Sequence, residues 1–281
     1  MIAFIGLGNM GRGMCRNLVL KHLLTKEGSN QNSLIVFNRT RSRSEELQAQ
    51  LPPGSVEIAD SVDDAVTRAD IIYTCLSNDD VVEQVLRNAL HSHPAGKLFV
   101  ECSTIHRLVT KVLTEQVLQA GARFVACPVS GAPDRAEAGQ LICVECGLPF
   151  CKGVMGRDVI DLSGKTPDAA STLKVLGNSF NMVEVIAEGH VLAEKAGLGN
   201  SLCHEYVEKF FPGVYASYST RMITGDYWNR DEPLFTAQLA RKDIKHALNL
   251  AETVGTRMPG LEVVDRNLAK VDTPSTSGAQ V

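Results

Sequence analysis

Three glycines near the start of the chain have the spacing of a dinucleotide-binding turn. The pattern Gly6-x-Gly8-x-x-Gly11 follows the apolar run Ile2–Ile5 and precedes a helical pattern. In such a turn the first glycine permits a tight bend, the second lets a pyrophosphate approach the backbone, and the third lets helix and strand pack closely. The helix N-terminus then presents N–H groups to the phosphate. The alternative is a glycine turn that serves packing alone. The predicted contacts are the residues of the turn, Gly6, Leu7, Gly8, Asn9, Met10 and Gly11.

A basic segment follows the second predicted strand, Leu34–Phe37. In NAD-selective sites an acidic residue at this point accepts a hydrogen bond from the ribose 2′-hydroxyl, and a carboxylate would repel the 2′-phosphate of NADP. This chain has no acid there and carries arginines at 39, 41 and 43, which suit charge-assisted phosphate contacts. The segment favours NADP as cofactor, with NAD as the alternative, and a solvated basic loop is the other interpretation. The predicted contacts are Asn38, Arg39 and Thr40.

A lysine and an asparagine lie one helical turn apart later in the chain. Lys174 and Asn178 are four residues apart in a helical pattern, so they share one helix face. A lysine beside a cofactor crevice is a candidate general acid/base. A solvated lysine beside an ordinary helix asparagine is the alternative.

Five strand–helix repeats in the first half of the chain predict the α/β class, with a Rossmann-type, doubly wound parallel sheet. Ligands of such sheets bind beyond the carboxyl ends of the strands. The ends of two predicted strands, at 70–76 and 97–101, therefore add residues to the cofactor site. These are Leu76, Ser77, Asn78, Ser103 and Thr104.

Beyond residue 165 the pattern is helical only. Thr166-Pro167 is typical of a helix start, and the pattern continues to about Lys195, before Gly197-Leu-Gly199. The sequence therefore predicts an NADP-binding Rossmann domain at 1–165, an all-helical substrate and oligomerisation domain at 166–272, and a flexible tail at 273–281.

Six segments resemble the β-hydroxyacid dehydrogenases, the family of 3-hydroxyisobutyrate dehydrogenase, tartronate semialdehyde reductase and glyoxylate/succinic semialdehyde reductase. They occur in the family's order and span nearly the whole chain. The segments are GLGNMG at 6–11, FNRT at 37–40, ECST at 101–104, PVSGAPDRAEAGQL at 128–141, LKVLGN at 173–178 and RKDIKHAL at 241–248. The resemblance implies a Rossmann domain, a long linking helix and an all-α C-terminal domain that often builds homodimers or homotetramers.

The resemblance also implies roles for single residues. Ser130 and Gly131 would hold the substrate carboxylate, and Lys174 would be the proton donor and acceptor. The expected activity is that of an NAD(P)-dependent dehydrogenase or reductase, which transfers a hydride between NADP(H) and a small 3-hydroxy acid or its semialdehyde. A second enzyme of the same superfamily, 6-phosphogluconate dehydrogenase, is an alternative resemblance, but its helical domain is larger than this chain allows. The remaining implied residues are Asn178, which orients substrate, Lys242, which closes over the cofactor, and its neighbour Asp243.

Two features depart from the family pattern. Where the family has a helix after the strand at 141–144, this chain has only residues 145–152, including Pro149, before the next strand, which is expected to begin at Gly153. A crossover with a helix needs at least about 10–12 residues, so no helix is expected there. The linking helix after Asn178 is also shorter, and each deleted residue rotates the rest of the helix by about 100°. These departures leave a second hypothesis, a non-catalytic or inactive dinucleotide-binding protein.

Composition narrows the class of partner. The 281 residues are 44% apolar and 21% charged, with a net charge of −4, which argues against a nucleic-acid or anionic-membrane partner. No apolar run approaches the roughly 20 residues of a membrane span. The first strand begins at residue 2, which leaves no room for a signal peptide. We expect a cytoplasmic homo-oligomer that acts on a small-molecule substrate.

The eight cysteines are scattered, and several lie in apolar runs, as is typical of reduced core residues. Cys143-x-x-Cys146 together with Cys151 admits a zinc or redox interpretation. No fourth ligand has a suitable spacing nearby, so no metal site is predicted.

Overall fold

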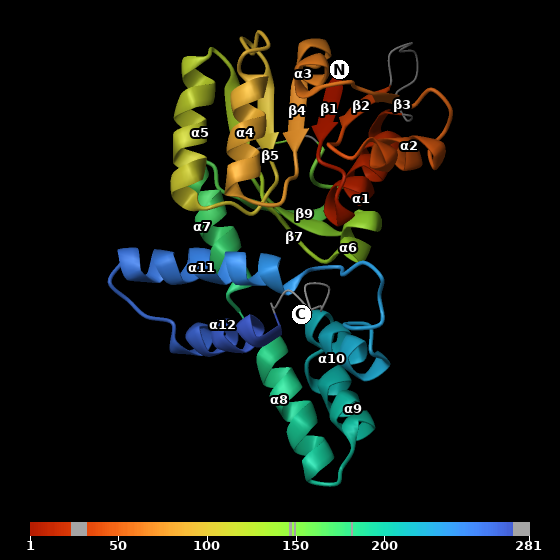
Figure 1. Ribbon diagram of the computed structural model, residues 1–281, viewed down its shortest axis with the longest axis vertical. Helices are drawn as coiled ribbons and strands as arrows, with labels where there is room; N and C mark the ends of the chain where they lie inside the picture. Colours follow the sequence, from red (N-terminus) through yellow and green to blue (C-terminus); the bar gives the residue numbers. More distant parts are fainter. Residues whose placement is uncertain (24–32, 146–147, 149, 181, 272–281) are drawn as a thin grey trace. The chain divides into compact units, whose positions relative to one another are not determined.

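A six-stranded parallel sheet forms the framework of the N-terminal half of the chain (Figure 1). The computed structural model describes residues 1–23, 33–145, 148, 150–180 and 182–271, so that the predicted tail at 273–281 and Cys146 lie outside the described residues. The strand order is β3-β2-β1-β4-β5-β6, which confirms the doubly wound topology. The strands are β1 (Ile2–Ile5), β2 (Leu34–Phe37), β3 (Val56–Ile58), β4 (Ile71–Thr74), β5 (Leu98–Glu101) and β6 (Arg123–Ala126).

Apolar residues cover both faces of this sheet. Alternate residues of β1 enter different cores: Ile2 and Phe4 belong to one cluster, and Ala3 and Ile5 to the other. This is why β1 and β2 are apolar throughout and do not alternate with polar residues. The second cluster packs against α3, α4 and α5, whereas the first packs against α1, α2 and a small second sheet. The helices are α1 (Asn9–Leu18), followed by the π-helical turn Val19–Leu23, α2 (Arg41–Ala49), α3 (Val62–Arg68), α4 (Asp79–Ala89) and α5 (Arg107–Gln119).

The second sheet has three strands in the order β7-β8-β9. β7 (Val129–Ser130) and β8 (Leu141–Glu145) are antiparallel and flank α6 (Pro133–Glu137), whereas β8 and β9 (Gly156–Asp161) are parallel. The described residues between β8 and β9 form turns and no helix, as expected from their number. The predicted strand start at 153 is wrong: β9 begins at Gly156, because residues 153–155 form turns.

The remaining elements are helices. The expected long linking helix is present as α7 (Pro167–Asn178) and α8 (Met182–Lys195), and Ser179 and Phe180 between them are not helical. The later helices are α9 (Asn200–Phe210), α10 (Val214–Thr224), α11 (Ala237–Thr253) and α12 (Pro259–Val271).

The chain divides into two compact units, Met1–Lys174 and the residues from Val175 onward. The boundary lies inside α7. In the second unit, Val175 packs with apolar residues of α11 and α12, such as Ile244 and Leu261. No helix in the described part of the chain has the length and apolarity to cross a membrane.

Asn17 joins α1 to α6. Its buried amide donates to the carbonyl oxygens of Gly13 at 2.8 Å, Ala136 at 2.9 Å and Glu137 at 3.0 Å. We expect Asn17→Ala to lower the free energy of unfolding by about 1–3 kcal/mol, because it leaves buried carbonyl groups without a donor. Urea denaturation measures the change. Asn88→Ala, at an exposed position of α4, is the matched control, and an equal effect of both variants would contradict the assignment.

Candidate functional site

Two glycines of the first turn are required by close contacts. Gly6 has φ of 104°, and a Cβ atom there would lie 2.3 Å from the carbonyl oxygen of Cys75. A Cβ atom on Gly11 would lie 2.1 Å from the carbonyl oxygen of Gly6. The first glycine therefore permits the bend, and the third lets α1 approach the end of β1, as the spacing predicts.

Gly8 has a different environment. It is the N-cap of α1 with φ of −71°, a conformation that other residues adopt, and no described atom lies within 4 Å of a Cβ atom built there. Among the described residues, no side chain caps the α1 N-terminus. Open space next to uncapped N–H groups suits a phosphate group that approaches the backbone. The turn therefore fits the pyrophosphate of a dinucleotide.

Asn38 connects the glycine turn to the basic segment. Its Oδ1 atom accepts a hydrogen bond from the Leu7 N–H at 2.9 Å, and its Nδ2 atom donates to the Thr40 carbonyl at 2.9 Å. Arg39 and Thr40 are both exposed, and Thr40 is the N-cap of α2. The side chain of Asn38 thus holds the two predicted parts of the cofactor site in a fixed relation.

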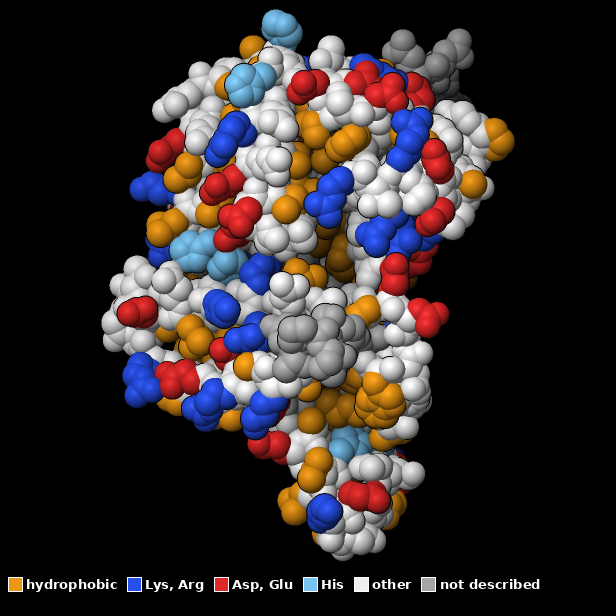
Figure 2. All heavy atoms as spheres, in the orientation of Figure 1, with side chains coloured by type: hydrophobic (Ala, Val, Ile, Leu, Met, Phe, Trp, Pro, Cys, Tyr) orange, Lys and Arg blue, Asp and Glu red, His pale blue; other side chains and the backbone are white. Residues whose placement is uncertain are grey.

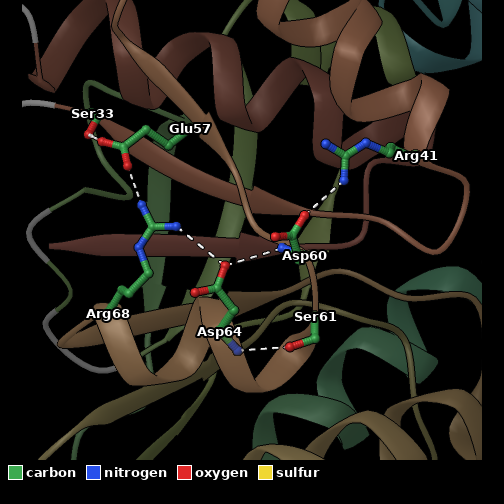
Figure 3. Close-up of polar contacts among 7 residues, drawn as sticks. All are labelled: Ser33, Arg41, Glu57, Asp60, Ser61, Asp64 and Arg68. Atoms are coloured by element: carbon green, nitrogen blue, oxygen red, sulfur yellow. Dashed lines mark hydrogen bonds and ion pairs between the residues drawn. The ribbon is translucent and has the colours of Figure 1, made fainter.

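An acidic residue that the sequence analysis did not single out lies beside the basic segment. Asp60, which follows β3, pairs with Arg41 at 3.0 Å, and Glu45 pairs with the same arginine at 3.1 Å. Figure 3 shows the Arg41–Asp60 pair within a longer chain of polar contacts that runs through Asp64 and Arg68. The charge of Arg41 is therefore compensated within the protein, and Arg39 is the exposed arginine that directly follows Asn38.

The loops after β4 and β5 are joined by a buried hydroxyl. Ser103 accepts a hydrogen bond from the Leu76 N–H at 2.7 Å, and its own N–H donates to Glu101. Ser103 is buried, so it fixes these loops, whereas Ser77 is exposed and Thr104 half-buried. Asn78 caps α4 by accepting from the Val81 N–H at 3.0 Å.

The segment expected to hold the substrate carboxylate ends β7. Ser130 pairs with Ile142 of β8. Gly131 has φ of 145°, and a Cβ atom there would lie 2.8 Å from a methyl carbon of Leu141. The positive φ of position 131 therefore favours glycine, and a larger residue would also displace the Leu141 side chain.

α7 carries the candidate catalytic lysine. Its first half is attached to α5, where Ser171 and Thr110 share a hydrogen bond of 2.6 Å and Asp168 pairs with Arg107 at 3.6 Å. Lys174 is buried. The helix ends at Asn178, so the expected shortening would lie after both predicted residues and would leave their one-turn relation intact.

One buried carboxylate holds two other predicted residues in the second unit. Asp243 accepts from the Asn178 amide at 2.7 Å and pairs with the Lys242 ammonium at 3.1 Å. Asp243 is only 6% exposed. It therefore positions Asn178 and Lys242, which is a more specific role than the sequence suggested.

Two of the cysteines in the rejected metal pattern do come together. The sulfur atoms of Cys143 and Cys151 form a cluster with that of Cys127, all within 4.8 Å of one another. Cys127 follows β6 and is remote in sequence from the other two, so spacing alone could not reveal the cluster.

Comparisons with known proteins agree with this geometry. Residues 1–149 match the family model described as the NAD binding domain of 6-phosphogluconate dehydrogenase. The chain is 30% identical to the NADH-dependent oxidoreductase ucdB of Aspergillus ustus, over 92% of this chain and 88% of that protein. It is 28% identical to glyoxylate/succinic semialdehyde reductase 2 of Arabidopsis thaliana, over 92% of this chain and 71% of that protein.

A solved structure shows the same fold. The 3-hydroxyisobutyrate dehydrogenase (ygbJ) from Salmonella typhimurium superposes with a TM-score of 0.83 at 20% identity, covering 99% of this chain and 96% of that one. The glycine turn, the sheet order and the matched domain define an NAD(P)-dependent oxidoreductase. Within that class, the chain belongs to the β-hydroxyacid dehydrogenase family.

The contrast between Gly8 and Gly11 yields a test. Gly8→Ala should fold with a loss of no more than about 1 kcal/mol, because the N-cap conformation and the space both accept alanine. It should weaken NADPH binding at least about tenfold, since the methyl group fills the space in front of the N–H groups.

Gly11→Ala is the matched variant. It should lose about 3 kcal/mol or more of stability, because α1 must move away from the Gly6 carbonyl. Thermal unfolding and fluorescence titration with NADPH measure the two effects. Unchanged NADPH affinity in Gly8→Ala would show that the cofactor does not approach this turn.

Proposed function

We propose that the protein transfers a hydride between NADP(H) and a small 3-hydroxy acid or its semialdehyde, with Lys174 as general acid/base. The observation that carries the proposal is a buried lysine on α7, one turn from an asparagine that a buried carboxylate fixes in place. Similarity to a glyoxylate/succinic semialdehyde reductase supports the substrate class.

The protein's own residues provide the proton and the orientation. When bound, the cofactor would supply hydride chemistry: addition to the carbonyl carbon in reduction, or removal from the hydroxyl-bearing carbon in oxidation. During reduction, the Lys174 ammonium gives a proton to the carbonyl oxygen as that oxygen gains charge. During oxidation, the neutral amine takes the proton from the hydroxyl group. Each reduction consumes one hydride and one proton, and the product is the alcohol.

Substrate orientation is assigned to the β7 segment and to Asn178. Hydrogen-bond donors at Ser130 and Gly131 would bind the carboxylate, and the pairing of β7 with β8 holds this segment in place. Asp243 fixes the Asn178 amide and thereby reduces the freedom of a substrate contact. Lys242, held by the same carboxylate, is proposed to close over the cofactor.

The preference for NADP rests on Arg39. Asn38 occupies the position where an acid would exclude a 2′-phosphate, and Asp60 and Glu45 already compensate Arg41. The name of the Aspergillus relative gives NADH as its cofactor, whereas the solved structure of Psf3 is a complex with NADP+. The exposed guanidinium of Arg39 favours the phosphorylated cofactor.

We also propose that the chain forms a homodimer or homotetramer through its second unit. Large apolar side chains are exposed along α8, α9 and α10, which is typical of a surface covered in an assembly. The exposed apolar residues include Val191, Leu192, Leu202, Tyr206 and Phe210.

On the face drawn in Figure 2, acidic and basic side chains are interleaved, which is unlike the clustered basic surface of nucleic-acid-binding proteins.

Replacement of the lysine tests the reaction. Lys174→Ala should lower kcat about 10²–10⁴-fold, because the proton transfer loses its donor, and should leave NADPH affinity within about twofold. NADPH oxidation is followed with glyoxylate, succinic semialdehyde and other small semialdehydes.

Lys165→Ala, at an exposed position just before α7, is the matched control and should retain full activity. If the wild type binds NADPH but turns over no member of the panel, the enzyme hypothesis fails. The chain would then be an inactive dinucleotide-binding protein.

A second variant tests cofactor selection. Arg39→Ala should lower kcat/KM for NADPH about tenfold or more, because a charge-assisted hydrogen bond contributes about 1.5 kcal/mol or more, and should leave the value for NADH unchanged. Arg123→Ala, exposed at the amino end of β6, should change neither value. A wild-type preference for NADH would overturn the NADP assignment.

A further inference from the structure

Three buried thiols meet between the two sheets of the first unit. Cys127 follows β6, Cys143 lies on β8, and Cys151 lies in the turns before β9. All three side chains are fully buried, and their sulfur atoms lie within 4.8 Å of one another. The sulfur atoms of Cys127 and Cys151 are 3.6 Å apart. A fourth buried cysteine, Cys102 after β5, lies close to Cys127.

A tyrosine hydroxyl beside this cluster has no partner among the described residues. Tyr73 of β4 is fully buried, and its hydroxyl group makes no hydrogen bond there. Cys102, Cys127, Cys143 and Cys151 all lie near enough to this hydroxyl to interact with it electrostatically. An unpaired buried hydroxyl is costly, and a neutral thiol is a weak acceptor. A thiolate would accept its hydrogen bond strongly.

The geometry points to a site for a thiophilic metal ion: we propose that Cys127, Cys143 and Cys151 bind Zn²⁺ or Cu⁺ as thiolates, with the Tyr73 hydroxyl donating to one of them. Thiolates bound to zinc at about 2.3 Å lie about 3.8 Å apart in a tetrahedron. The sulfur atoms of Cys127 and Cys151 are 3.6 Å apart, and all three sulfur atoms lie within 4.8 Å of one another. Soft thiolate ligands select both ions. Binding releases the three thiol protons, so no oxidant or reductant is involved.

A disulfide between Cys127 and Cys151 is the competing use of the same atoms. It would require an oxidant such as a peroxide to reach fully buried thiols. It would also leave the third thiol and the Tyr73 hydroxyl without a role. A metal ion uses all four groups and can bind while the chain folds. It would join the carboxyl edge of the large sheet, at Cys127, to the small sheet, at Cys143.

Metal content of the purified protein provides the test. The chain is expressed in medium supplemented with zinc, or in a separate culture with copper, and the bound metal is measured by mass spectrometry. We expect about one ion per chain, and the culture that gives it identifies the ion. Refolding from denaturant with Cd²⁺ should produce a sulfur-to-metal charge-transfer band. Cys143→Ala should lose both signals, and Cys203→Ala, on α9, should keep both.

Tyr73→Phe tests the proposed metal site without replacing a cysteine. It should lower metal affinity about 10–100-fold, as is usual when a hydrogen bond to a ligand is lost. It should not lower the stability of the metal-free protein, because it removes an unpaired buried hydroxyl.

Absence of bound metal from the wild type in every condition would overturn the proposal. So would a titration of the unfolded, unreduced chain that finds two fewer thiols than its eight cysteines. That second result would show that two of the cysteines form a disulfide.

Discussion

The close approach of α1 to the end of β1 is the constraint on which the rest of the first unit depends. Gly11 touches the Gly6 carbonyl, and Gly13 leaves room for α6, since a Cβ atom there would lie 2.6 Å from the Glu137 nitrogen. The Asn17 amide then binds the end of α6. One helix therefore joins the cofactor turn to the element between β7 and β8. The proposed carboxylate contacts, Ser130 and Gly131, are fixed relative to the turn by backbone packing.

Local pattern was sufficient for the sheet and the turn. Leu34–Phe37 has the same bounds in prediction and structure, because a short apolar run between polar segments specifies a buried strand. Contacts between residues remote in sequence could not be predicted in this way. The pairing of Asp60 with Arg41 and the buried position of Ser103 depend on which loops the sheet brings together. The start of β9 at Gly156 was missed because turns replace the residues that the apolar pattern assigned to the strand.

The linking helix is interrupted after Asn178, and the position of this break bears on the orientation of Lys174. A deletion inside a continuous helix would rotate every later residue and could turn the lysine away from its site. Here the helix stops at Asn178, so Lys174 and Asn178 keep their common face. Attachment of α7 to α5 through Ser171 and Thr110 lies on the other side of the lysine from the break. The elements after Phe180 have their own polar contacts, such as His190 with Ser219 at 2.8 Å.

The short connection between β8 and β9 determines which buried residues lie beside these strands. A crossover helix would place many residues between the two strands, whereas the short connection brings Cys151 back next to Cys143 of β8. The sheet order then brings Cys127 to the same point, because β6 ends beside β8. Leu148, Phe150 and Met155 of the connection are buried in the same core. The short connection thus contributes a compact apolar cover and a third thiol. The described buried residues of this connection are therefore part of the core of the first unit.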